Sequence, residues 1–88
     1  MLRISDEQSA GNKRVVKLEG SVSASSVAQV EFYCQQILTE GITLTIDMSD
    51  VSFLDRSGVD LFARLLSHGV QLDNCSPFVS ELLKQVAS

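Results

Sequence analysis

The residues that could most obviously bind a ligand or take part in a reaction are four aspartates close together in the chain: Asp47, Asp50, Asp55 and Asp60. Carboxylates at this density could hold a divalent cation if their side chains converged. The same residue type also satisfies free amides at helix starts, and we place Asp50 at a loop and Asp55 at a helix start. We therefore favour capping over a metal site, and predict neither a metal nor another cofactor.

The tetrapeptide Asp55-Arg56-Ser57-Gly58 is the second candidate. With Asp55 as N-cap, Ser57 falls at about the second helical position, exposed where free amides and the helix dipole favour negative charge. A phosphate there, with a charge of roughly −1.5 to −2, would change the surface around Asp50 and Asp60 without unfolding the chain. By physics alone, a serine in a first helical turn is more often a neutral helix former.

Other reactive side chains form no catalytic set. His68 has no carboxylate near it in sequence and precedes a glycine at a predicted helix end, where a histidine complements the dipole. Cys34 and Cys75 match no CxxC spacing, so we interpret them as plain thiols, one in the core and one in a loop. Gly58 stands alone, whereas a phosphate loop needs several glycines. We predict no catalytic residues and no enzyme activity.

Composition excludes several classes of function. The 88 residues are 44% hydrophobic with one proline, which is typical of one globular domain spanning residues 1–88. The formal charge is −4 and the basic residues are scattered, so we expect no nucleic-acid binding. No apolar run approaches the roughly 20 residues of a membrane span. We therefore expect a cytoplasmic protein without direct membrane insertion.

Hydrophobic periodicity in the first half predicts two strands and a helix. A short edge strand around 2–4 precedes a turn, and a second strand covers 14–19. Apolar residues at three- and four-residue steps then predict an amphipathic helix over 23–40. Ser23 suits its N-cap through the side-chain oxygen, and Gly41 suits its left-handed stop.

The second half alternates strands with helices. Strict alternation predicts a strand over 42–48, followed by a separate short apolar segment, 51–54. A helix from the tetrapeptide ends near 68–69, a brief strand covers 70–72, and Pro77 begins a last helix. The expected buried stripes are Val59, Phe62, Leu65 and Leu66 in the first of these helices, and Phe78, Leu82 and Val86, flanked by Val79 and Leu83, in the second.

The order ββαβαβα defines the expected fold class. It is α/β, with a small mixed β-sheet of about four strands and two to three amphipathic helices packed on one face. Its two β-α-β crossovers should be right-handed.

The run 42–58 resembles the signature of the STAS family. In that family an apolar strand ending in an aspartate is followed by a short hydrophobic stretch and by Asp-Ser-Ser-Gly at a helix start. The resemblance extends less closely over most of the chain. Arg56 replaces the first serine of the tetrad, and Gly20-Ser21-Val22-Ser23 stands where the family often has Gly-Glu-Leu-Asp. We expect a truncated C-terminal part, without the family's last strand or closing helix.

This resemblance implies an anti-sigma factor antagonist. In such proteins the serine matching Ser57 is phosphorylated by a partner that is both an anti-sigma factor and a serine kinase, and the unphosphorylated form binds that partner. Phosphorylation is therefore expected at Ser57. The partner-binding residues that we expect around it are Ser21, Ser23, Asp50, Asp55, Arg56, Gly58 and Asp60.

The resemblance to the family also implies two other possible functions. Short STAS proteins accompany lipid-transporting ABC complexes, so the partner could instead be a transporter subunit and the chain an accessory subunit. Members have also been proposed to bind nucleotides, but no phosphate cradle is evident here. Self-association into a homodimer stays open.

Overall fold

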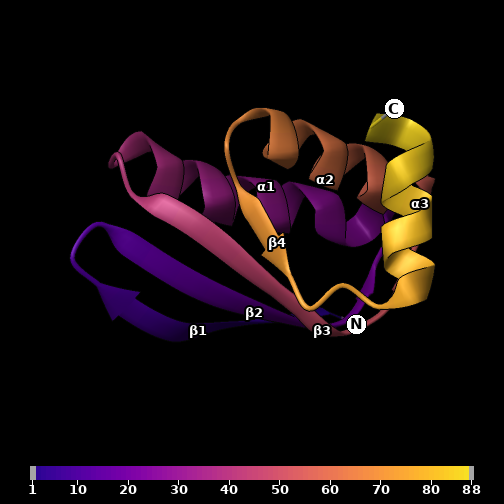
Figure 1. Ribbon diagram of the computed structural model, residues 1–88, viewed down its shortest axis with the longest axis horizontal. Helices are drawn as coiled ribbons and strands as arrows, with labels where there is room; N and C mark the ends of the chain where they lie inside the picture. The colour runs from indigo at the N-terminus through magenta and orange to yellow at the C-terminus, as the bar shows by residue number, and fades with distance from the viewer. Residues whose placement is uncertain (1, 88) are drawn as a thin grey trace.

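The computed structural model describes residues 2–87, with the side chains of 8–10 and 85–87 left out of the description. The elements follow the predicted order ββαβαβα (Figure 1). They are β1 (Leu2–Ala10), β2 (Lys13–Val22), α1 (Ala24–Thr39), β3 (Thr43–Leu54), α2 (Arg56–Ser67), β4 (Gln71–Asp73) and α3 (Pro77–Ala87).

The four strands form one mixed sheet in the order β1-β2-β3-β4. β1 and β2 make an antiparallel hairpin around Gly11, whose φ of 61° lies in the left-handed region that favours glycine. β3 and β4 join in parallel, because α1 and α2 return the chain to the same end of the sheet. β1 is longer than predicted, and β2 continues beyond Gly20 to Val22.

β3 corrects one prediction, because it is a single strand of 12 residues where we expected a strand and a separate segment. Its pairing with β2 is irregular at two places, and each time β3 contains one residue more than β2. Such bulges change which face the following side chains occupy. Val51 therefore lies in the core although it breaks the alternation set by Met48, and the second bulge brings Leu54 back into phase with Met48. Asp50 consequently lies in a strand and not in a loop.

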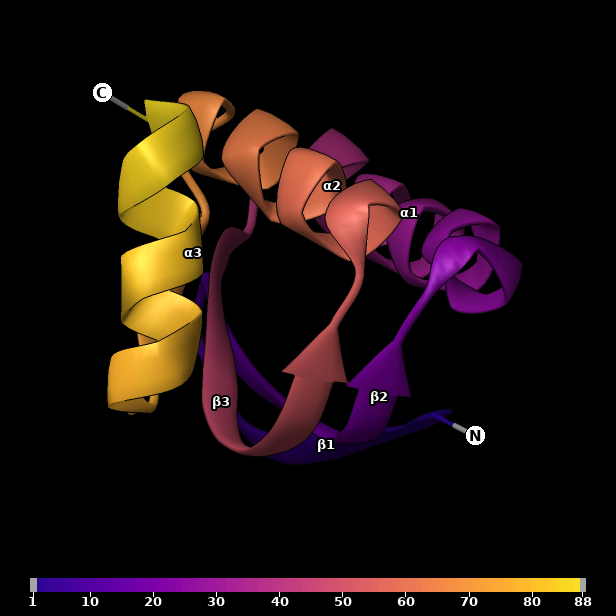
Figure 2. The same ribbon diagram turned by 90° about the vertical axis from the view of Figure 1, so that its right-hand side faces the viewer.

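α1 and α2 cover one face of the sheet and α3 stands at its edge (Figure 2), which agrees with the predicted fold class. Alternate residues of β2 and β3 point into this layer, and α1 contributes its predicted stripe. The side chains with the least exposure come from every layer: Val16, Leu18, Val22, Val30, Leu44, Ile46, Met48, Leu61, Phe62, Leu65 and Val79.

The buried stripe of α2 differs from the prediction at two positions. Val59, Phe62 and Leu65 are buried as expected, but Leu61 is also fully buried, whereas Leu66 is 38% exposed. The physical reason is that α1 and α3 both pack against α2. A helix with neighbours on two sides buries a wider arc than a helix that only covers a sheet.

The stripe of α3 is rotated by one residue relative to the prediction. Val79 and Leu83 are buried, Leu82 is half-buried and Phe78 is 53% exposed. α3 packs mainly against α2 at the edge of the sheet (Figure 2), so a different face of it points inward. The predicted burial of Val86 lies outside the described side chains.

Candidate functional site

The predicted site lies where two helices start side by side. β2 and β3 run parallel and end in register at Val22 and Leu54. Each strand is followed at once by a helix, so the N-termini of α1 and α2 meet at the end of the sheet where β2 and β3 finish (Figure 2). We call residues 20–25 and 54–58 the helix-start edge.

The Asp55 carboxylate joins these two helices. Its Oδ1 accepts a hydrogen bond of 2.9 Å from the Gly58 amide of α2, and its Oδ2 accepts one of 3.0 Å from the Ala24 amide of α1. The Asp55 amide also donates to the Val22 carbonyl, over 3.1 Å. The predicted N-cap role of Asp55 is confirmed, and the same side chain caps a second helix.

Ser23 does not make the predicted cap bond. Its backbone is extended, as at an N-cap, but its side chain accepts no bond from the first turn of α1. Its hydroxyl oxygen lies 3.1 Å from that of Ser25. The side-chain acceptor at this helix start is instead the Asp55 carboxylate, which binds the amide of Ala24, the first residue of α1.

Gly58 is required by a close backbone approach. A Cβ atom there would lie 2.6 Å from the Val22 carbonyl oxygen, well inside the contact distance. Because Gly58 is buried, its predicted contribution to partner binding can only be indirect. It allows the end of β2 to lie against the first turn of α2.

Ser57 lies at the second position of α2, as predicted, but it is half-buried and not exposed. Arg56 and Asp60 are exposed on the same helix. The first turns of α1 and α2 contain no acidic residue of their own. The negative charge that balances the two helix dipoles at this edge is therefore that of Asp55.

Asp50 and Asp47, two of the four candidate aspartates, interact with different residues. Asp50 forms an ion pair with Lys17, with Nζ and Oδ2 2.9 Å apart, and this hydrogen bond raises the pKa of Lys17. Asp47 accepts from the Ser49 amide over 2.9 Å and from the Asn74 amide group over 3.2 Å. The bond from Ser49 is the main reason why the pKa of Asp47 is lowered. The four carboxylates thus do not converge on one point.

Phe53 is a surface residue directly before the helix-start edge that the sequence did not reveal. It is 49% exposed, and its Cα pairs with that of Ser21. An exposed aromatic side chain is a common anchor in protein interfaces. The sequence pattern assigned Phe53 only to a short apolar segment, 51–54, because the bulges on both sides of Val51 interrupt the alternation there.

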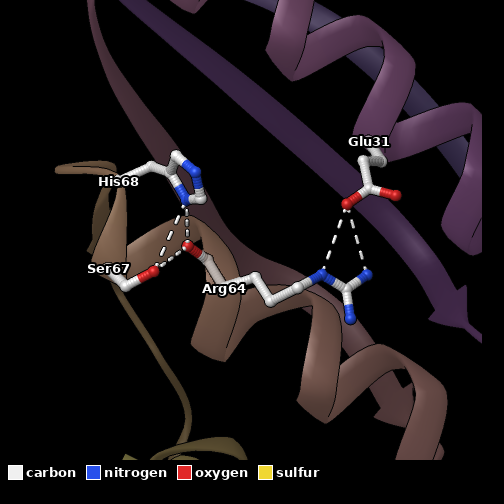
Figure 3. A network of polar contacts seen from close by, with 4 residues as sticks. All are labelled: Glu31, Arg64, Ser67 and His68. Atoms are coloured by element: carbon white, nitrogen blue, oxygen red, sulfur yellow. Dashed lines mark hydrogen bonds and ion pairs between the residues drawn. The ribbon is translucent and has the colours of Figure 1, made fainter.

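His68 belongs to a polar network at the opposite end of α2 (Figure 3). Its Nδ1 donates to the Arg64 carbonyl over 2.7 Å, and the Ser67 hydroxyl donates to the same oxygen over 2.7 Å. The Arg64 guanidinium reaches the Glu31 carboxylate of α1 at 3.3 Å. The predicted helix-end role of His68 agrees with its bond to the Arg64 carbonyl. The pair of Arg64 and Glu31 joins α1 to α2.

An apolar hollow of about 280 Å³ lies between the end of α2, β4 and α3. Its lining comprises Leu66, Leu72, Cys75, Ser80, Leu83 and Lys84. Cys75, which lines this hollow, and Cys34, which lies in the core, are both free thiols. Burial raises the pKa of the Cys34 thiol to about 11. Leu66 lies nine residues after Ser57, about 13 Å along the helix axis, so the hollow is separate from the helix-start edge.

Comparison with known proteins shows that the chain belongs to the STAS family described as "Mlab, STAS domain", which matches residues 5–87. No curated protein sequence matches the chain. Within residues 2–87, no helix combines the length and the apolar character needed to cross a membrane.

Solved structures share the fold at low sequence identity. The unphosphorylated anti-sigma factor antagonist SpoIIAA matches with a TM-score of 0.76 and 21% identity, over 93% of this chain and 82% of that one. The phosphorylated SpoIIAA of Bacillus matches with 0.75 and 21%, over 96% and 83%. The murine anion transporter Slc26a9 matches with 0.60 and 24%, over 89% of this chain but 14% of the transporter.

Proposed function

We propose that the chain is a phospho-regulated protein-protein interaction switch of the anti-sigma factor antagonist type. In the cytoplasm, its unphosphorylated form binds an anti-sigma factor that is also a serine kinase, and phosphorylation of Ser57 releases that partner. The protein acts by binding, and the catalytic groups belong to the partner.

The position of Ser57 carries this proposal. It lies in the first turn of α2, between exposed Arg56 and the buried Gly58, at an edge where two helix N-termini meet. Both forms of SpoIIAA, phosphorylated and unphosphorylated, share the fold of this chain. A phosphate here would add a large negative charge to a surface that includes Asp60 and Phe53. Such a charge opposes docking of a surface that matches the unmodified edge.

Affinity capture with variant proteins tests the proposal. Wild-type and Ser57→Ala proteins should retain the same kinase-like partner, and Ser57→Asp should lose it. Ser67→Asp, at the far end of α2, is the matched control and should behave as wild type. Incubation of the captured partner with ATP should then add phosphate to Ser57, as read by mass spectrometry. A partner that binds all four proteins equally, and leaves Ser57 unmodified, contradicts the switch.

A transport accessory subunit is the second candidate. The family description "Mlab, STAS domain" and the fold of the Slc26a9 domain favour it, because the latter belongs to a transporter. The chain would then bind a transporter subunit constitutively. This function predicts a partner that Ser57→Asp leaves in place and that Phe53→Ser weakens.

A further inference from the structure

We propose that Asp55 transmits the state of Ser57 from α2 to the start of α1. Phosphate on Ser57 displaces the Asp55 carboxylate from the Ala24 amide, so the switch alters both helix starts. This inference rests on the proposed function for the modification itself. In that step the kinase transfers the γ-phosphoryl group of ATP to Ser57 Oγ, the hydroxyl proton leaves and ADP is released.

The junction has one movable part. The Asp55 backbone is held by its bond to the Val22 carbonyl, and the same carbonyl lies close against α2 at Gly58. The Asp55 side chain spans the remaining gap, with one oxygen on each helix. Rotation of that side chain breaks both bonds without moving either strand.

A phosphate on Ser57 competes for one of these bonds. Ser57 directly precedes Gly58, so its phosphate oxygens can accept from the Gly58 amide in place of Asp55 Oδ1. Two anions then share one helix start, and their repulsion disfavours the native position of the carboxylate. The Gly58 amide keeps an acceptor, whereas the Ala24 amide loses one.

No side chain of the first turn of α1 replaces the lost acceptor, so the exposed Ala24 amide is left to water. This turn contains no acidic residue, and the Ser23 hydroxyl is paired with that of Ser25 and caps nothing. The first turn of α1 should therefore open locally when Ser57 is phosphorylated. Ser21 and Ser23, both expected partner contacts, lie directly before this turn. The partner would thus sense the modification on two segments 31 residues apart, as measured from Ala24 to Asp55.

Amide hydrogen exchange by NMR tests the coupling without a kinase or a partner. The sample is the full chain with phosphoserine incorporated at position 57 during synthesis, compared with unmodified protein. Loss of one hydrogen bond should raise exchange at Ala24 about tenfold, while Gly58 changes less than about twofold. Phosphoserine at exposed Ser49 of β3 adds the same charge elsewhere and should leave both amides unchanged.

Asp55→Asn separates positioning from simple stability. An amide has one acceptor oxygen where a carboxylate has two, so this variant can cap only one of the two amides, and we expect it to keep the local N-cap bond to Gly58 and lose the one to Ala24. Ala24 should then exchange fast before modification, and phosphoserine at 57 should add nothing further. An unchanged Ala24 amide in phosphorylated wild type would overturn the inference, as would a rise shared with the core amide of Ile46. Either result leaves the proposed partner switch to its own capture experiment.

Discussion

The helix-start edge and the corner formed by the end of α2, β4 and α3 are held together in different ways. At the edge, backbone amides and one carboxylate make short bonds between segments far apart in sequence. At the corner, a three-residue strand and apolar side chains surround an open hollow. The predicted regulatory serine therefore lies in the part of the molecule with the more constrained backbone.

This difference suggests how a small domain can use charge as a signal. Hydrogen bonds at the edge depend on the position of one charged group, so another charge placed nearby changes them directly. Apolar contacts at the corner are nondirectional and respond mainly to volume. Four substitutions break or sharpen this comparison.

The largest effect is expected inside α2, between the two regions. Leu61→Ala should lower the free energy of unfolding by about 3 kcal/mol, because Leu61 is fully buried and its removal leaves a cavity. Leu66→Ala, the matched change at the corner, should cost under about 1 kcal/mol, because Leu66 is 38% exposed. Urea denaturation measures both. Equal losses would mean that the corner is packed as tightly as the core.

Asp55→Ala tests the edge. It removes both cap bonds and should cost about 2 kcal/mol, at about 1 kcal/mol for each capped helix. Ser23→Ala is the control and should stay within about 0.5 kcal/mol, because the Ser23 side chain caps nothing. Thermal unfolding followed by circular dichroism compares the two. A larger loss for Ser23→Ala would reverse the assigned capping roles.

Gly58→Ala distinguishes helix propensity from backbone contact. Propensity alone predicts that alanine stabilises a helix by about 1 kcal/mol over glycine. The 2.6 Å approach to the Val22 carbonyl predicts the opposite sign, a net loss of about 1–2 kcal/mol. Ser57→Ala, at the adjacent position, should change stability by less than about 0.5 kcal/mol. A stabilised Gly58→Ala protein would show that the two segments are not in contact.

Ser76→Ala tests the corner and has the smallest expected effect. Ser76 Oγ accepts from the Val79 amide at 3.2 Å and is the cap of α3, directly before Pro77. Its loss should cost about 1 kcal/mol. Hydrogen exchange should rise in the first turn of α3 and stay unchanged at Ala24. Opening at both places would mean that edge and corner are not independent.

Periodicity was sufficient to predict the order of elements and the fold class. The strict alternation of β3 before Met48 and the three- and four-residue steps of α1 needed only local information. The bulges in β3 were not predictable in this way, and neither was the burial of Val51, which lies out of phase with Met48. The stripe of α3 depended on packing against α2, which no local pattern reports.

The candidate site was predictable in part for a related reason. The capping role of Asp55 toward Gly58 is a local pattern, three residues long. Its bond to Ala24 requires the parallel arrangement of β2 and β3, so it emerges only from the fold. The contacts of Ser21, Ser23, Asp50, Arg56 and Asp60 with a partner stay predictions.

The affinity of the captured partner for two forms of this chain tests the central claim most directly. Isothermal titration should compare unmodified protein with protein that contains phosphoserine at position 57. We predict a dissociation constant at least about tenfold higher for the phosphorylated form, equivalent to about 1.4 kcal/mol. An equal or lower dissociation constant for the phosphorylated form would contradict the account.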